Sequence, residues 1–108
     1  MSIGNEGNGN EEVGIRILTL NDCDYCNWLK SELGAEGISY VDIDADEHDD
    51  FSTAIEQKFK TNTYPIVFID LGPSIVTIVG ETELETSNTL RTFDTIPQLV
   101  GIIKQYIK

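Results

Sequence analysis

The sequence predicts an α/β domain in which a mixed four-stranded sheet is flanked by helices. Runs rich in β-branched residues alternate with segments in which apolar residues recur every three or four positions, the period of an amphipathic helix. In chain order these segments read β-α-β-α-β-β-α. The first strand–helix–strand unit requires a right-handed parallel crossover, whereas a tight turn between the last two strands requires an antiparallel pair. The sheet is therefore expected to be mixed.

The first half of the chain supplies two strands and two helices. Residues 13–20 and 39–43 are the predicted strands, joined by a helix over residues 24–33 that ends at Gly34 and Gly37, as helices commonly do. An acidic run then leads into a second helix, whose apolar residues are Phe51, Ile55 and Phe59.

The second half supplies a hairpin and a last helix. Residues 65–70 and 75–79 are the hairpin strands, and the last helix runs over residues 95–107 with Pro97 in its first turn. Residues 80–91 are polar and fit either a long loop or a weak extra strand that ends at Leu90.

Composition limits the classes of partner. Nineteen acidic residues against seven Lys and Arg give a net charge of −12, which repels nucleic acid and anionic lipid. No segment has the length of a membrane span or the apolar core of a signal peptide. We therefore expect a cytoplasmic monomer with no nucleic acid or membrane partner. Residues 1–12, rich in Gly, Asn and Glu, are predicted to be a flexible tail before a domain over residues 13–108.

Cys23 and Cys26, the only cysteines, lie where the first strand gives way to the first helix. A thiol at a helix N-terminus is favoured as thiolate, and a second thiol one turn later can close a disulfide with it. A zinc site needs four ligands, and besides these two cysteines the chain offers only His48 as a nitrogen ligand, so we expect no metal. The alternative, two inert cysteines buried in the core, is disfavoured because the flanking Asp22 and Asp24 are expected to be solvated. The pair predicts dithiol–disulfide redox chemistry.

Two further features are assigned structural roles. The alternating Asp42, Asp44 and Asp46 lack the glycine and glutamate that a calcium loop needs at its sixth and twelfth positions. They are predicted to be a solvated strand end. Trp28 is expected to pack in the core rather than to form a patch that faces a partner.

Three motifs occur in a familiar order: Cys23-Asp24-Tyr25-Cys26 after the first strand, Thr63-Tyr64-Pro65 at the third, and Thr92-Phe93-Asp94 before the last helix. With them the sequence resembles a glutaredoxin of the thioredoxin-fold superfamily, where the motifs read C-P-Y-C, T-V-P and G-G-[aromatic or small]-D. The resemblance covers Ile15 to the C-terminus. It implies a thioredoxin-like fold and a glutaredoxin-like domain over residues 13–108.

The resemblance also implies a mechanism. The protein would be a glutathione-dependent thiol–disulfide oxidoreductase that reduces protein or glutathione mixed disulfides. Cys23 would attack the substrate disulfide, Cys26 would resolve the resulting mixed disulfide, and glutathione would restore the dithiol. Glutathione and disulfide-bearing proteins are the implied partners, and no bound cofactor is expected.

The glutathione contacts are carried over from the same family. Pro65 would be cis and pack against the cysteines, and the backbone of Tyr64 would pair with the peptide part of glutathione. Phe93 and Asp94 would hold the γ-glutamyl end through backbone N–H groups at the last helix. The full set implied for glutathione is Tyr25, Thr63, Tyr64, Pro65, Thr92, Phe93 and Asp94.

The sequence departs from the family near the thiol. Asp24 replaces a proline and Asp22 precedes the nucleophile; one carboxylate about 6 Å away opposes the thiolate by roughly 0.7 kcal/mol in a water-like medium. No residue from 19 to 22 is basic, although family members often have Lys or Arg there. Lys58 and Lys60 are candidates to replace it, but helix-surface solvation is their expected role.

Two departures concern the glutathione groove. Arg91-Thr92 stands where the glycine pair is expected, and a rival alignment places residues 80–83 at that position instead. Tyr64 replaces the usual valine and adds a bulky ring.

Three alternative functions remain open. The first is a thioredoxin-like protein disulfide reductase for a partner such as ribonucleotide reductase. The second is an iron–sulfur cluster carrier, with Cys23 from two protomers and two glutathiones holding the cluster. The third is an interaction module whose CxxC is vestigial.

Overall fold

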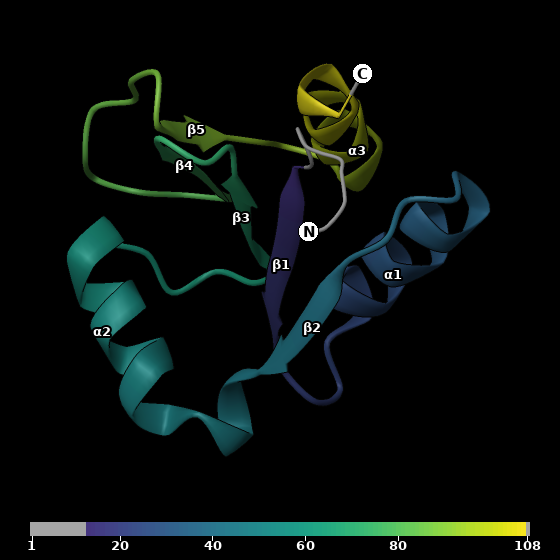
Figure 1. Ribbon diagram of the computed structural model, residues 1–108. Helices are drawn as coiled ribbons and strands as arrows, with labels where there is room; N and C mark the ends of the chain where they lie inside the picture. The colour runs from purple at the N-terminus through teal and green to yellow at the C-terminus, as the bar shows by residue number, and fades with distance from the viewer. Residues whose placement is uncertain (1–12, 108) are drawn as a thin grey trace.

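The structure, a computed structural model, describes residues 13–107. Its elements form one sheet with helices on both faces (Figure 1). In chain order they are β1 (Gly14–Thr19), α1 (Asp24–Ala35), β2 (Val41–Asp44), the single-turn η1 (Ala45–Glu47), α2 (Asp49–Phe59), β3 (Ile66–Asp70), β4 (Ile75–Val79), β5 (Leu90–Thr92) and α3 (Ile96–Tyr106). The flexible tail predicted over residues 1–12 lies outside the described residues.

The sheet is mixed, as predicted. Its strands lie in the order β2-β1-β3-β4-β5. β1 pairs in parallel with β2, as the crossover rule requires, and antiparallel with β3. β3 and β4 form the predicted antiparallel hairpin. This arrangement agrees with the thioredoxin-like fold that the resemblance to glutaredoxins implies.

The prediction of four strands was wrong, because β5 adds a fifth. It pairs in parallel with β4, with Thr77 opposite Leu90 and Val79 opposite Thr92. The extra strand that was considered begins at Leu90 rather than ending there. Only Leu90 is apolar and buried among its three residues. A strand this short shows no alternation of apolar and polar residues, so the sequence pattern could not reveal it.

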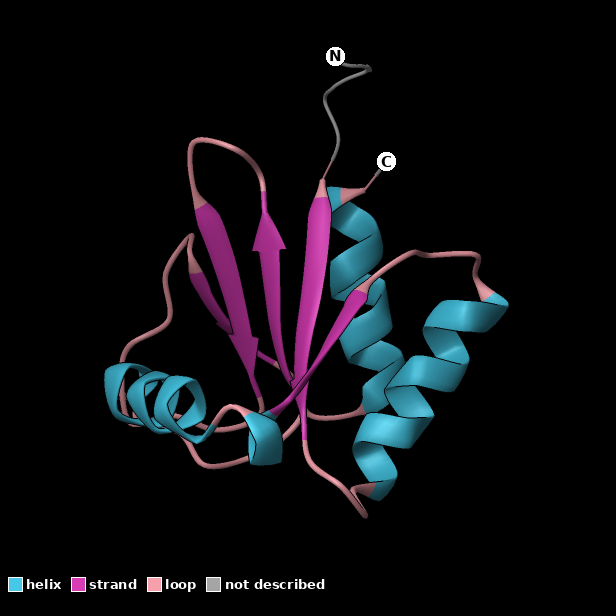
Figure 2. Cartoon of the chain, turned by 60° about the horizontal axis from the view of Figure 1, so that its bottom comes forward, coloured by secondary structure: helices cyan, strands magenta, loops and turns pink. Residues whose placement is uncertain are grey.

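Helices cover the two faces of the sheet unequally (Figure 2). α1 and α3 lie on one face over a core of thirteen buried apolar residues, among them Ile17, Leu29 and Leu99. α2 lies on the other face over only six, among them Leu18 and Phe68. Burying apolar area is the main stabilising term of a fold, so the α1–α3 face is the anchored side of the molecule.

Among residues 13–107, no helix is both long enough and apolar enough to cross a membrane.

Candidate active site

Cys23 caps the N-terminus of α1. Its backbone is extended, with φ −105° and ψ 107°, and its Sγ accepts the backbone N–H of Cys26 at 3.1 Å. A disulfide joins the two residues, whose Cα atoms are 5.2 Å apart. Cys26 is completely buried, whereas Cys23 is partly exposed. An incoming sulfur can therefore reach Cys23 but not Cys26.

A tight turn delivers Cys23 to this position. Asp22 has φ 57°, in the left-handed region, which Asp and Asn adopt more readily than most residues. The preceding Asn21 donates its backbone N–H to the Asp46 carboxylate over 3.4 Å. An aspartate at position 22 is thus explained by the turn from β1 into α1, which needs this backbone conformation.

The segment before β3 lies beside the cysteine pair. The Tyr64–Pro65 peptide bond is cis, as the family resemblance implied, and Pro65 is buried. The Tyr64 hydroxyl donates to Glu56 Oε2 at 2.6 Å, which holds the ring towards α2. Burial, followed by this bond and the charge of Glu56, raises the pKa of the Tyr64 hydroxyl above its usual value.

Thr63 ties this segment to the start of the loop that follows β4. Its Oγ1 accepts the backbone N–H of Glu81 at 3.2 Å. A Cβ at Gly80 would lie 2.9 Å from the same oxygen, closer than real Cβ atoms come. A side chain at position 80 would therefore force Thr63 or the loop to shift.

A groove of about 280 Å³ lies along these segments. Its lining residues are Tyr25, Thr63, Tyr64, Gly80, Glu81, Phe93, Asp94 and Ile96. The structure thus brings together five of the residues predicted to contact glutathione. Pro65 is buried next to the groove rather than lining it. Thr92 lines a neighbouring hollow of about 660 Å³ with Lys60, Glu81 and Glu83.

The two alignments weighed for this region are both represented in the groove. Gly80 and Glu81, from the rival alignment, lie beside Phe93 and Asp94 from the preferred one. The chain leaves the groove after Glu81 and returns at Phe93, whose N–H donates to Val79 O at 3.1 Å. An alignment can assign only one of the two segments to the family motif. In the folded chain the loop between them brings both segments to the same groove.

The backbone N–H groups at the N-terminus of α3 are hydrogen-bonded within the protein. The Asp94 N–H donates to Gln98 Oε1 at 2.5 Å, and Thr95 caps the helix by accepting the Gln98 N–H at 3.2 Å. With Phe93 bound to Val79, both backbone N–H groups expected to hold the γ-glutamyl end are already used. Sequence reasoning missed Gln98, although a Gln three residues after a Thr cap is a recognisable capping pattern.

Comparison with known proteins places this site in a family. The model of the glutaredoxin family matches residues 15–71, more than half of the chain. The chain belongs to the glutaredoxin family. A solved structure described as "Structure of a malarial protein" resembles this glutaredoxin with a TM-score of 0.51 and 14% identity, over 90% of this chain and 99% of that one. That likeness shows the fold alone. No curated protein sequence matches the chain.

Trp28 of this glutaredoxin is not in the core, so that prediction was wrong. It is 43% exposed and stacks on Tyr25, with ring centroids 6.4 Å apart. Cys26, Leu29 and Leu33 form the buried face of α1, and Trp28 lies beside that face. A helix with a single buried stripe leaves neighbouring apolar positions outside, and the sequence did not show on which side of the stripe Trp28 lies.

The charge around the groove is acidic. Glu81 and Asp94 line it, Asp22 and Asp24 flank Cys23, and no groove-lining residue is basic. Lys58 lines a separate apolar hollow beneath α2. Lys60 lines the hollow that adjoins the groove, with Glu81 and Glu83, but not the groove itself. Within residues 13–107, no group of three metal-binding side chains is close enough to hold an ion.

Proposed function

We propose that this glutaredoxin is a glutathione-dependent reductase of protein disulfides and glutathione mixed disulfides, acting through Cys23 and Cys26. Thiol–disulfide redox chemistry follows from the family. One observation carries the assignment of roles: Cys23 is partly exposed at a helix N-terminus, and its disulfide partner Cys26 is completely buried. A reducing compartment such as the cytoplasm would supply the glutathione.

The first half of the cycle consumes the dithiol. The Cys23 thiolate attacks one sulfur of the substrate disulfide; a new S–S bond forms to Cys23, and the other substrate sulfur leaves as a thiolate that takes up a proton. The Cys26 thiolate then attacks Cys23 Sγ and releases the second substrate thiol. Two electrons have passed to the substrate, and the enzyme is left with the Cys23–Cys26 disulfide seen in the structure.

The second half restores the dithiol. One glutathione thiolate attacks Cys23 Sγ, freeing the Cys26 thiol, and a second attacks the glutathione sulfur of that mixed disulfide. Glutathione disulfide leaves, and both cysteines carry protons again. The α1 N-terminus favours the Cys23 thiolate as leaving group, because unpaired N–H groups and the helix dipole stabilise its charge.

The groove is the proposed place for the non-reacting part of the substrate. Tyr25, Thr63, Tyr64, Phe93 and Asp94 line it, and Pro65 is buried directly after Tyr64. Thr92 lines the adjoining hollow, which a longer ligand would reach.

A second candidate is a protein disulfide reductase that draws electrons from a protein donor instead of glutathione. It is supported by the absence of a basic residue among those lining the groove and by the internal bonds of the Phe93 and Asp94 N–H groups. At Phe93 and Asp94 a glutathione carboxylate would find no basic side chain among the groove-lining residues and no free N–H of these two residues.

The deciding experiment follows NADPH consumption with glutathione, glutathione reductase and hydroxyethyl disulfide. We compare the wild type with Cys23→Ser and Cys26→Ser. We expect Cys23→Ser to lose at least about 10³-fold in rate, as enzymes do when the nucleophile is removed. Cys26→Ser should keep activity on glutathione mixed disulfides, because these need one thiol only.

The opposite result discriminates between the candidates. If the wild type shows no turnover with glutathione but reduces insulin disulfides with a thioredoxin reductase, the second candidate replaces the first. Turnover that persists in Cys23→Ser would contradict both.

A further inference from the structure

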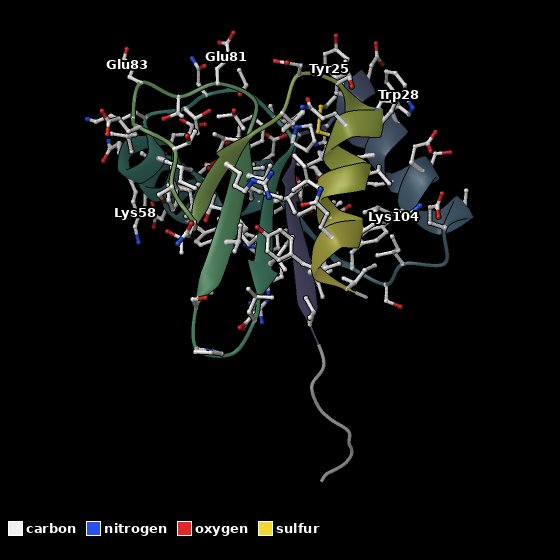
Figure 3. The ribbon with its side chains drawn as sticks, turned by 90° about the horizontal axis from the view of Figure 1, so that it is seen from above. Tyr25, Trp28, Lys58, Glu81, Glu83 and Lys104 are labelled. Carbon is white, nitrogen blue, oxygen red and sulfur yellow. A yellow bond between two sulfur atoms is a disulfide. The ribbon has the colours of Figure 1, made fainter. Side chains whose placement is uncertain are left out.

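An acidic and aromatic rim borders the reactive disulfide. We define it as Tyr25, Trp28, Glu81, Glu83 and Asp94. Figure 3 shows Glu83, Glu81, Tyr25 and Trp28 along one edge of the molecule, with the disulfide sulfur close to Tyr25. Tyr25, Glu81 and Asp94 line the groove itself, and Glu83 lines the adjoining hollow. A protein substrate whose disulfide reaches Cys23 from the groove would contact this rim.

The aromatic part of the rim is exposed. The Tyr25 side chain is 62% exposed and Trp28 43%, and their rings stack at an interplanar angle of 24°. Two large exposed aromatic residues beside a reactive group are typical of a contact surface, since such residues dominate binding energy at interfaces. Aromatic faces also attract the Lys ammonium and, more often, the Arg guanidinium.

The acidic part of the rim forms no ion pair among the described residues, although Lys60 lines the adjoining hollow with Glu81 and Glu83. The three ion pairs of the described residues use the carboxylates of Asp70, Asp42 and Glu36, none of which belongs to the rim. Glu81, Glu83 and Asp94 are all exposed. Asp22 and Asp24 add two further negative charges next to Cys23.

An anionic ligand finds little at the same place. No basic side chain lines the groove, the Asp94 N–H is bound by Gln98, and the Phe93 N–H is bound by Val79. A cationic ligand finds carboxylates and two aromatic rings. Charge complementarity of this kind sets which partners associate and how fast, and it rejects partners of like charge.

From these observations we propose that the rim selects polypeptide substrates whose disulfide is flanked by Lys or Arg. The inference builds on the proposed function, because Cys23 is taken to attack the substrate disulfide. It adds the class of substrate: a cationic segment over Tyr25 and Trp28, with its charges facing Glu81 and Asp94.

The kinetic test uses three peptides that differ only in charge. Each is a disulfide-linked homodimer with one cysteine per chain, flanked by Arg-Gly, Ser-Gly or Glu-Gly repeats, and is reduced with glutathione, glutathione reductase and NADPH. Exposed ion pairs contribute about two- to five-fold each. We therefore expect kcat/KM for the Arg peptide to exceed that for the Glu peptide at least about 10-fold at low salt, and the difference to shrink at 0.5 M NaCl.

Variants locate the preference on the rim. Glu81→Gln and Asp94→Asn should each reduce the Arg-over-Glu preference by about two- to five-fold. Glu85→Gln is the matched control, because Glu85 is exposed in the same loop but lines neither the groove nor the adjoining hollow. The control should keep the wild-type preference.

A binding test that needs no redox step separates the two proposals. Trp28 is the only tryptophan of the chain, so intrinsic indole fluorescence reports on the rim. The oxidised wild type is titrated with the same peptides carrying serine in place of cysteine. The Arg peptide should change the emission at lower concentration than the Glu peptide, and Tyr25→Ala should weaken that response.

Each outcome has one meaning. Turnover of all three peptides with equal kcat/KM overturns the charge preference and leaves the proposed function standing. An emission change with the Arg peptide, but turnover of none, supports the rim and overturns the proposed function. No turnover and no difference in emission overturn both.

Discussion

The two sides of the active site differ in how they are built. The cysteine side, with Cys23, Cys26 and Pro65, lies within the residues matched by the family, and its helix α1 is anchored by fully buried residues. The groove side, residues 80–94, comes after that match ends at residue 71. It consists of an exposed loop, the three-residue β5 and the lead-in to α3.

The two sides also differ in what holds them in place. The cysteine side is held by the packed core and keeps the family arrangement of CxxC and cis proline. The groove side is held by a few polar bonds, those of Thr63 and Gln98 among them, and carries the acidic residues. Surface loops tolerate change better than packed elements, so the residues of the groove side can vary while the cysteine pair and its helix are kept.

The largest contrast should appear in stability. Leu29→Ala removes a fully buried side chain beneath the cysteine helix, and such changes lower the free energy of unfolding by about 2–5 kcal/mol. The matched change on the groove side is Leu84→Ala, at a residue 39% exposed, with an expected effect within about 0.5 kcal/mol. Urea unfolding followed by circular dichroism measures both. Equal losses would show that the two sides are equally well packed.

Gly80→Ala tests the closest contact of the groove side. The new methyl would meet Thr63 Oγ1, so Thr63 or the loop must shift, and overpacking of this kind is destabilising by about 1–3 kcal/mol. Thr63→Ala in the same chain removes the obstructing oxygen and should recover part of that loss. A double-mutant cycle by urea unfolding measures the coupling. Strict additivity would mean that the contact has no energetic weight.

Gln98→Ala tests whether the bond from the Asp94 N–H to Gln98 keeps this donor from a ligand. Without the amide, the Asp94 N–H becomes available to a glutathione carboxylate. One such hydrogen bond is worth about 1 kcal/mol, so KM for glutathione should fall by about fivefold. Gln98→Glu keeps an acceptor and adds a negative charge, so it should raise KM instead. Steady-state rates against glutathione concentration check both, and a rise in KM for Gln98→Ala would contradict the prediction.

Tyr64→Phe should have the smallest effect, and the difference in stability from the wild type should shrink at high pH. The raised pKa of the Tyr64 phenol means that the folded state holds this proton more tightly than the unfolded chain does. The resulting stabilisation is complete below the ordinary tyrosine pKa near 10 and is lost as the pH rises above it. The wild type should therefore lose more stability than Tyr64→Phe in urea unfolding between about pH 9 and 11. Parallel curves would show that the Glu56 bond does not favour the protonated form.

The cysteine side could be predicted from the sequence because its signals are local. Strands of four or more residues show their apolar pattern, and Cys23 precedes a helix whose Leu29 and Leu33 recur at the helical period. The cis state of the Tyr64–Pro65 bond came from the family resemblance alone and agrees with the structure.

The groove side depends on contacts between residues distant in sequence, which local patterns do not contain. The side-by-side position of Gly80 and Phe93 follows from a strand of three residues. The hydrogen bond from the Asp94 N–H to the Gln98 side chain does not alter the spacing of apolar residues in the helix, so the sequence pattern does not reveal it. Trp28 was assigned to the core because apolar character alone does not distinguish the edge of a helical stripe from its centre.

β5 has a consequence for how this family member can diversify. Val79 is aligned with Thr92, and Thr77 N–H binds Thr89 O at 2.8 Å, so the chain re-enters the sheet close to where it left. Both ends of the excursion over residues 81–88 are thereby fixed by backbone bonds that any sequence can make. The excursion can be shortened, lengthened or exchanged as a cassette, giving new recognition surfaces on an unchanged redox scaffold.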